Sequence, residues 1–315
     1  MEQMLWQLLL LFLGFVCLVK GADWFVDGAA DLAGKFGISE IVIGLTIVAM
    51  GTSLPETSVS LNSAIKDSGG ITIGNVLGSN IVNILLILGV SALFSRLPVD
   101  KRMMRYEMPF LLGMTVLLPC MGLFDHTVGR MDGAVLLLLM AVYLIYLLYR
   151  DKGTEDATEL KKEKSFAPLW KILLLISAGL GSIVLGSELA VDAAIALARM
   201  IGISERVIGL TVVAIGTSLP ELVTSVAASR KGETDIAVGN IVGSNIFNIL
   251  FVTGLTAVIV PVDYQQAFRQ DSIIAVCAVA LFYVCLLPKR SLGRISGILM
   301  ILSYAAYTAY LICSG

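Results

Sequence analysis

Apolar runs long enough to cross a lipid bilayer follow one another along almost the whole chain. A hydrocarbon core about 30 Å thick needs about 20 helical residues per crossing. The chain is 57% hydrophobic and only 15% charged, with a mean hydropathy of +0.90, so one soluble core could not bury its apolar surface. Ten runs are long enough, at roughly 5–33, 39–65, 71–95, 107–124, 131–150, 168–200, 204–230, 236–260, 271–288 and 293–313. The sequence therefore predicts an all-α membrane protein with ten transmembrane helices.

Two of these regions are copies of one another, because residues 37–89 return in recognisable form at 202–254. Both copies contain GTSLPE, and both end in a similar segment, GNVLGSNIVN in the first and GNIVGSNIFN in the second. The offset is 165 residues throughout, and 24 of the 46 positions from Gly44 to Gly89 are identical to their partners. A constant offset without a gap indicates an internal duplication.

The duplication predicts how the two halves are oriented. Each half holds five apolar runs, an odd number, so the second half enters the membrane from the opposite side. We therefore expect two inverted five-helix repeats, residues 1–150 and 168–315, joined by a linker at 151–167. The linker is rich in charges of both signs and has no apolar periodicity, which is typical of a solvated connection. Inverted repeats of this kind allow secondary transporters to open one site to either side.

The GTSLPE segment is unusual at membrane depth. Pro55 has no backbone N–H and its ring collides with the carbonyl four residues earlier, so the helix must break near it. Irregular backbone inside a membrane survives only where it is buried in protein or lines a wet cavity. Carbonyl oxygens near Ala49, the hydroxyls of Thr52 and Ser53, and the carboxylate of Glu56 would then be available to a cation. The second and seventh helices are both expected to break, because the second copy repeats the same groups at Ala214, Thr217, Ser218, Pro220 and Glu221.

The next helix in each half carries a polar stripe. Asn75, Ser79 and Asn83 recur at steps of four residues, so they share one helix face. The second copy has the same stripe at Asn240, Ser244 and Asn248. If the two broken helices meet, two carboxylates and several hydroxyl, amide and carbonyl oxygens converge, and Ca²⁺ takes 6 to 8 such ligands. Thiolate or imidazole ligands for zinc or copper are missing from this set.

Basic residues predict the orientation in the membrane. Starting from the N-terminus and alternating sides, one face collects 16 Lys and Arg residues and the other only 5, with Lys20 left inside the first run. The positive-inside rule then places both termini outside and the linker in the cytoplasm. The expected location is the cell (inner) membrane, with the lipid bilayer as a partner, no nucleic acid, and an oligomeric state that the sequence does not determine.

We call GNVLGSNIVN (74–83) and GNIVGSNIFN (239–248) the GSN segments. The paired GTSLPE segments and the two GSN segments strongly resemble the alpha repeats of the cation/calcium exchanger superfamily, in particular its prokaryotic sodium/calcium antiporter branch. The resemblance covers essentially the whole chain. It implies a five-plus-five inverted-repeat fold and export of Ca²⁺ driven by entry of Na⁺, with no cofactor and with one monomer sufficient for transport. It also implies ten side-chain ligands for the transported ions: Thr52, Ser53, Glu56, Ser79, Asn83, Thr217, Ser218, Glu221, Ser244 and Asn248.

Several alternatives remain open at this point. Asn83 and Asn248 stand where sodium/calcium members commonly carry an aspartate in one repeat, so Ca²⁺/H⁺ exchange and K⁺-dependent exchange are both retained. A cation channel is a further alternative, because polar half-helices also line pores. An enzyme is not expected: a hydrolase using Ser53 or Ser218 would need a buried activating base, and the single histidine, His126, lies in a loop.

Overall fold

The computed structural model describes residues 2–65, 70–151, 167–202 and 214–314, and it is mostly helical. The helices are α1 (Glu2–Phe36), α2 (Glu40–Ile43), η1 (Gly44–Val48), α3 (Ala49–Thr52), α4 (Leu54–Ile65), α5 (Gly70–Ile81), η2 (Val82–Ile87), α6 (Leu88–Phe94), α7 (Lys101–Arg105), α8 (Glu107–Asp125), α9 (Arg130–Asp151), α11 (Leu169–Met200), α13 (Ala214–Thr217), α14 (Leu219–Lys231), α15 (Thr234–Phe247), η4 (Asn248–Val252), α16 (Thr253–Ile259), α17 (Phe268–Leu286) and α18 (Arg294–Ser314). The segments η1, η2 and η4 are short π-helical stretches within longer helices.

Two small antiparallel ladders tie the two halves of the chain together. Strand β1 (Leu97–Pro98) pairs with β4 (Ser291–Leu292), and β2 (Thr127–Val128) pairs with β3 (Val262–Asp263). Each ladder is only two residues long, so it fixes the ends of neighbouring helices rather than forming a sheet layer.

Six helical segments in the described part of the chain are long and apolar enough to cross a membrane, or seven if one bent pair counts as a single span. They lie at 3–36, 71–94, 130–149, 169–200, 234–259 and 268–286, and the bent pair covers 40–65. Further predicted spans are also helical, as α8 and α18. The start of the predicted span at 204–230 and nearly all of the linker at 151–167 lie outside the described residues. The molecule is therefore an integral multi-pass membrane protein, and the ten-span count stays a prediction.

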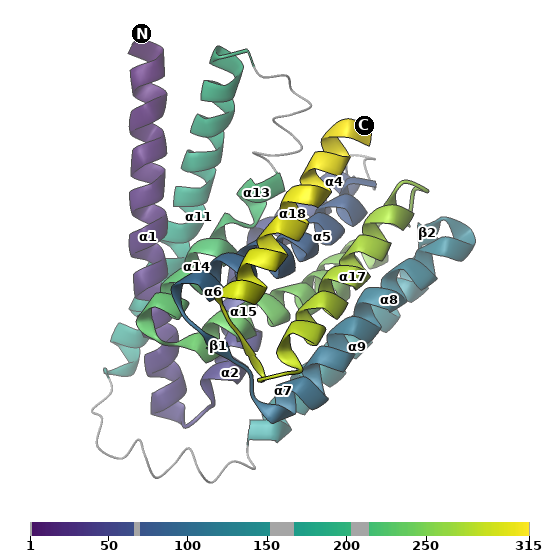
Figure 1. Cartoon of the computed structure of the whole chain (residues 1–315), viewed down its shortest axis with the longest axis horizontal. Coiled ribbons are helices and arrows are strands. Elements are labelled where there is room, and N and C mark those ends of the chain that lie inside the picture. Colours follow the sequence, from purple (N-terminus) through teal and green to yellow (C-terminus); the bar gives the residue numbers. More distant parts are fainter. Residues whose placement is uncertain (1, 66–69, 152–166, 203–213, 315) are drawn as a thin grey trace.

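The helices form a buried centre with more exposed helices around it. In the apolar 18-residue stretches of Ile71–Phe94 and Thr234–Ile259, 78% and 83% of the residues are buried. In the corresponding stretch of α1, only 17% are buried. In Figure 1, α1 and α11 stand side by side at one edge and α8, α9 and α17 lie at the other, with α14 and α15 between them. The two GSN segments thus belong to the most buried helices of the fold.

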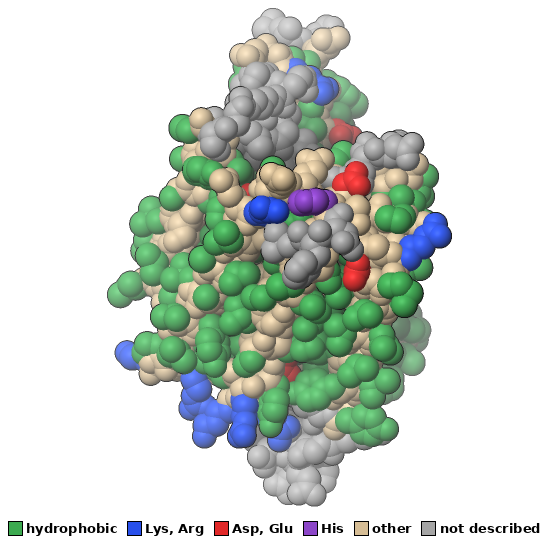
Figure 2. All heavy atoms as spheres, turned by 90° about the vertical axis from the view of Figure 1, so that its right-hand side faces the viewer, with side chains coloured by type: hydrophobic (Ala, Val, Ile, Leu, Met, Phe, Trp, Pro, Cys, Tyr) green, Lys and Arg blue, Asp and Glu red, His purple; other side chains and the backbone are tan. Residues whose placement is uncertain are grey.

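The molecular surface matches a membrane environment. Large apolar side chains are exposed on several outer helices, including Trp6, Phe12, Leu138, Leu174 and Leu302. Figure 2 shows hydrophobic side chains across the middle of one face, with a cluster of Lys and Arg at its lower end and, toward its upper part, the histidine among Asp, Glu and separate Lys or Arg side chains. Lipid tails can cover the apolar band, because water would not be a favourable solvent for it.

Close glycine contacts hold α1 against α11. A Cβ atom added to Gly179 would lie 2.6 Å from the backbone nitrogen of Phe25 and 2.8 Å from the carbonyl oxygen of Gly21. A Cβ added to Gly14 would lie 2.9 Å from the carbonyl oxygen of Gly186. The two backbones therefore touch where small residues allow it, as in other tightly packed membrane helices. Gly14 corresponds to Gly179 in the repeat, and Gly21 corresponds to Gly186, both at an offset of 165. The contact of Gly14 with Gly186 is therefore the repeat counterpart of the contact of Gly179 with Gly21.

This seam gives a testable prediction. Gly179→Ala is expected to lower the free energy of unfolding by about 1–3 kcal/mol, because the new methyl group overlaps the α1 backbone. Gly181→Ala, on the exposed side of the same helix, meets no described atom within 4 Å and should leave the protein as stable as wild type or more stable by up to about 1 kcal/mol. Denaturant unfolding of both variants in the same detergent measures the difference, and equal stabilities would contradict the described packing.

Candidate ion site at the broken helices

Both GTSLPE segments interrupt their helices. The helix that contains the first segment ends at Thr52, as α3, and restarts at Leu54, as α4. Ser53 lies between them at φ −85°, ψ 11°, and the helical parts before and after it are bent by 44° relative to each other. Ser218 has nearly the same backbone conformation, φ −91° and ψ 8°, between α13 and α14. Each break lies two residues before the proline, within the turn where the missing N–H and the steric clash predict it.

The breaks bring the two glutamates together. Glu56 and Glu221 have no exposed surface, and their carboxylates lie close enough to interact electrostatically. The hydroxyl of Ser53 donates a hydrogen bond of 2.9 Å to Oε1 of Glu221, although the two residues are 168 positions apart. In the opposite direction, the hydroxyls of Ser218 and Ser79 lie beside Glu56. Each broken helix therefore presents its serine to the carboxylate of the other.

Polar groups from the GSN helices complete the surroundings of Glu221. The hydroxyl of Ser244 lies 3.5 Å from Oε1 of Glu221 and 3.4 Å from the carbonyl oxygen of Ala49. The hydroxyl of Thr52 donates to Oδ1 of Asn240 at 3.1 Å. The Ala49 carbonyl also accepts the Ser53 backbone N–H at 3.1 Å, and the Thr52 hydroxyl lies 3.4 Å from the same oxygen.

Asn75 and Asn240 support the glutamates from behind. The amide of Asn75 donates to the carbonyl oxygen of Glu56 at 3.2 Å and to the hydroxyl of Ser60 at 2.9 Å. The amide of Asn240 donates to the carbonyl oxygen of Glu221 at 3.5 Å and to the hydroxyl of Ser225 at 2.9 Å. These bonds fix the first turn of each half-helix, so the carboxylates are held in place by the backbone as well as by their own contacts.

A second asparagine pair was not singled out from the sequence. Asn80 and Asn245 each donate to the other's backbone carbonyl, at 3.2 Å and 3.3 Å. Their side-chain oxygens also accept the amides of Asn248 and Asn83, at 3.1 Å and 3.0 Å. The four amides form one network between the two GSN helices. The available signal was the conserved spacing of GSN in both copies, which places Asn80 and Asn245 at matching positions.

The network orients Asn83 and Asn248. Because their amide nitrogens are used by Asn245 and Asn80, their Oδ1 atoms point elsewhere and are buried without a hydrogen-bond partner. Both residues also lie in π-helical stretches, a feature common at functional sites. In η4 the carbonyl of Asn248 accepts the backbone N–H of Thr253, five residues later, and it also accepts the hydroxyl of Thr253 at 3.1 Å.

Several oxygens of the site lack hydrogen-bond partners within the described protein: both carboxylate oxygens of Glu56, Oε2 of Glu221, Oγ of Ser218, and Oδ1 of Asn83 and of Asn248. An unsatisfied buried carboxylate is costly, so such a set of oxygens calls for a positively charged occupant. Hard oxygen donors suit Ca²⁺ and Na⁺ rather than softer metals. Among the described residues, no group of three or more His, Cys, Asp or Glu side chains could hold a metal ion, so the acidic groups at this site are the pair Glu56 and Glu221.

Thr217 and Ala214, the two other predicted ligands in the second GTSLPE region, lie in α13. Thr217 ends α13 and is partly buried. Ala214 begins α13, and its side chain lies outside the described part of the structure. The other predicted residues, from Ala49 and Thr52 to Asn248, are buried.

Comparison with known proteins agrees with this architecture. A family model described as sodium/calcium exchanger protein matches residues 6–149 and 171–313. The inner membrane protein YrbG of Escherichia coli (strain K12) is 38% identical over 316 residues, which cover 96% of this chain and 95% of YrbG. The sodium/calcium exchanger MaX1 of Methanosarcina acetivorans is 32% identical over 344 residues, which cover 96% of this chain and 97% of MaX1.

A solved structure gives the same result. The sodium-calcium exchanger NCX_Mj, soaked with 2.5 mM Na⁺ and 10 mM Sr²⁺, superposes with a TM-score of 0.85 at 33% sequence identity. The match covers 97% of this chain and 99% of that one. With the family model matching most of the chain, and with relatives of this identity along nearly its whole length, the protein belongs to the sodium/calcium exchanger family and is a cation transporter of the membrane.

Proposed function

We propose that this protein exchanges Ca²⁺ for Na⁺ across the cell membrane by alternating access to the site between Glu56 and Glu221. The observation that carries the proposal is the pair of fully buried carboxylates with three unpartnered oxygens between them. Thr52, Ser53, Ser79, Asn83, the Ala49 carbonyl and their counterparts in the second half would supply neutral oxygen ligands. The MaX1 and NCX_Mj relatives are named as sodium/calcium exchangers, which supports the same ion pair here.

The charge of the site explains coupling. Two glutamates neutralise one Ca²⁺, and the same oxygens can be shared among Na⁺ ions that compete with it. An empty site would hold two unpaired carboxylates in a low dielectric, so the unloaded protein should resist the change from one open side to the other. Exchange then follows because the site changes sides only when it is loaded.

The proposed architecture is two inverted five-helix repeats, residues 1–150 and 168–315, joined by the linker at 151–167. It is supported by bonds that repeat at an offset of 165, such as the mutual contacts of Asn80 and Asn245. The family model also matches the two halves separately. A two-fold relation within the membrane plane would let each half open the site to one side.

We place both termini outside and the linker in the cytoplasm. In Figure 1 the N-terminus and the C-terminus both lie toward the upper end of the molecule, while β1 and α7, which adjoin the basic cluster at Arg96, Lys101, Arg102 and Arg105, lie toward the lower end. The positive-inside rule then makes the lower end cytoplasmic. Helices α1 and α11, joined by their glycine seam, are suited to slide together across the buried centre.

Two alternatives rest on Asn83 and Asn248. With amides at both positions, the site has two carboxylates only, so the driving ion could be H⁺, or Na⁺ with a requirement for K⁺. A cation channel is less consistent with the site, because both glutamates have no exposed surface and a conducting pore would need a hydrated path past them.

The deciding experiment is ⁴⁵Ca²⁺ uptake into proteoliposomes under Na⁺, K⁺ and H⁺ gradients, imposed one at a time. We expect uptake with an outward Na⁺ gradient, unchanged by K⁺, and little uptake with a proton gradient alone. Uptake driven by protons without sodium would replace the proposal with Ca²⁺/H⁺ exchange. Uptake that needs no counter-ion on the far side would identify a channel.

A further inference from the structure

A pocket with apolar walls and charged side chains at one end lies between α1, α14 and the end of α6. Its volume is about 590 Å³. The apolar walls come from three helices: Val19 on α1, Val90 and Phe94 on α6, and Leu222, Val223 and Val226 on α14. Val19 and Phe94 are 49% and 55% exposed, so the pocket is open toward the surface that lipid covers.

The pocket has the depth of one membrane leaflet. It runs along α14 from Leu222, next to the site residue Glu221, to Lys231 at the end of the helix. Nine residues of α-helix rise about 14 Å, close to half of a hydrocarbon core about 30 Å thick. A lipid acyl chain that enters from the helix end can therefore lie along these walls without leaving its leaflet.

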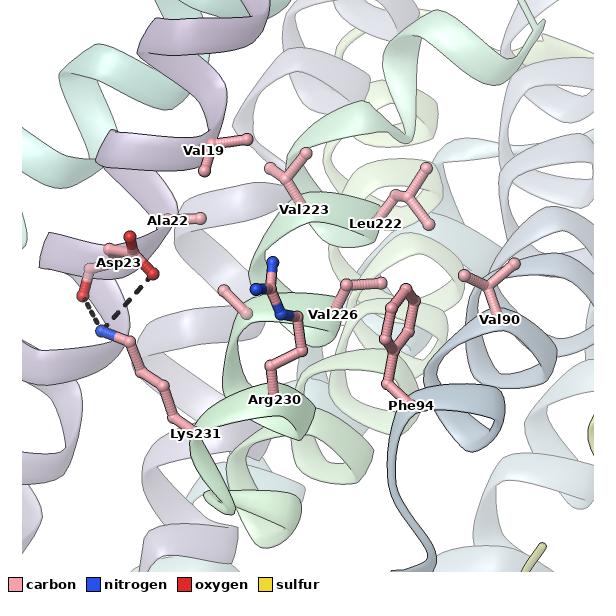
Figure 3. A pocket seen from close by; sticks show the side chains of 11 residues that line it. Val19, Ala22, Asp23, Val90, Phe94, Leu222, Val223, Val226, Arg230 and Lys231 are labelled. Atoms are coloured by element: carbon pink, nitrogen blue, oxygen red, sulfur yellow. Dashed lines mark hydrogen bonds and ion pairs between the residues drawn. The ribbon is translucent and has the colours of Figure 1, made fainter. Parts of the chain in front are cut away.

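The charges at the mouth of the pocket leave one cation for a ligand. Lys231 is paired with α1, because its Nζ lies 2.7 Å from Asp27 and 3.6 Å from Asp23. Arg230 has no acidic partner among the described residues. Figure 3 shows the guanidinium of Arg230 pointing into the pocket while Lys231 reaches away to Asp23. A guanidinium beside an apolar wall is well matched to a phosphate group, which it can bind through two hydrogen bonds.

More basic side chains continue around Phe94. A neighbouring pocket of about 640 Å³ shares Phe94 and is lined by Arg96, Lys289 and Arg294. Both arginines also make hydrogen bonds within the protein: Nε of Arg96 donates to the hydroxyl of Ser291 at 2.9 Å, and Nε of Arg294 donates to the backbone carbonyl of Leu93 at 3.2 Å. The surroundings of the mouth are thus positively charged, which favours an anionic headgroup over a zwitterionic one.

We propose that this pocket binds one anionic glycerophospholipid, with an acyl chain on the apolar walls between α1 and α14 and its phosphate on Arg230. A free phosphate would contact Arg230 but not the apolar walls. The proposal therefore requires that both Arg230 and the apolar walls contribute to binding of the lipid. Binding is measured without transport, and the result does not depend on which ions the protein exchanges.

Native mass spectrometry of the purified full-length protein tests the proposal. The protein is mixed with equal amounts of phosphatidylglycerol and phosphatidylcholine of the same chain length. Wild type should retain phosphatidylglycerol preferentially, and Arg230→Gln should lower the ratio of the two adducts about fivefold. Arg102→Gln removes a positive charge from an exposed site on α7 outside the pocket and should leave the ratio unchanged.

Two further arms separate lipid from free anion. Ala227→Phe fills part of the pocket without changing its charge and should reduce the adducts of both lipids. An excess of soluble glycerol phosphate should not displace phosphatidylglycerol. The proposal is overturned if Arg230→Gln and Arg102→Gln have the same effect, if Ala227→Phe binds lipid normally, or if glycerol phosphate competes. Should Arg230→Gln not fold, Ala227→Phe decides between these outcomes.

Discussion

Replacing Glu56 or Glu221 with glutamine is expected to lower Na⁺-dependent Ca²⁺ uptake by about 100-fold or more. The change keeps the shape of the side chain but removes half of the negative charge of this buried pair, which the proposed mechanism needs to neutralise the ion. Removing one partner from a buried charged set costs about 3–5 kcal/mol, and each 1.4 kcal/mol corresponds to about a tenfold change in affinity. Both variants should be affected alike, because each half of the chain donates one carboxylate to the same site.

The measurement is the initial rate of ⁴⁵Ca²⁺ uptake into sodium-loaded proteoliposomes, normalised to the amount of reconstituted protein. Asp263→Asn is the matched control, since it also neutralises one carboxylate, but in an exposed residue of β3. Its uptake should equal that of wild type. Normal uptake by either glutamine variant would show that the ion does not bind between the two glutamates.

The fold and the site differ in how far the sequence could predict them. Runs of 20 apolar residues admit few structures other than helices at membrane depth, so the helical segments were predictable. Pro55 and Pro220 located the helix breaks, because a missing N–H and a steric clash act within one turn. The repeat at offset 165 added long-range information, since it implied that Glu56 and Glu221 occupy equivalent places and could meet.

The asparagine network could not be predicted in the same way. Whether Asn80 faces lipid, its own helix or Asn245 depends on the rotation of two helices whose sequences are far apart. The π-helical stretch that contains Asn83 widens the next turn of the helix, and nothing in the composition of GNVLGSNIVN indicates it. The ion pairs of Lys231 with Asp23 and Asp27 could not be predicted from the sequence for the same reason, because they join residues more than 200 positions apart. Local sequence determines where a helix breaks, whereas packing determines what its polar face meets.

Asn248→Asp is expected to raise the affinity for Ca²⁺ by about tenfold or more. Oδ1 of Asn248 is buried without a partner on η4, which packs against α4, the helix that carries Glu56, and an aspartate would place a further negative charge there. Opposite unit charges 4 Å apart attract by about 4 kcal/mol at an effective dielectric constant of 20. Two effects oppose this gain. One is repulsion from Glu56 and Glu221, and the other is loss of the 3.1 Å hydrogen bond from the Asn248 side-chain amide to Asn80, which is worth about 1 kcal/mol.

A divalent ion gains more from a third carboxylate than Na⁺ does, because the Coulomb attraction scales with the charge of the ion. Calcium should therefore resist displacement by sodium in Asn248→Asp, and the exchange rate at low sodium should fall as Ca²⁺ is released more slowly. Isothermal titration with Ca²⁺ in detergent, with and without sodium, measures both effects. Asn62→Asp, on the exposed α4 surface, is the control for an added charge away from the site. If Asn248→Asp bound Ca²⁺ no more tightly than Asn62→Asp while keeping its fold, the unpartnered oxygen of Asn248 would not face the transported ion.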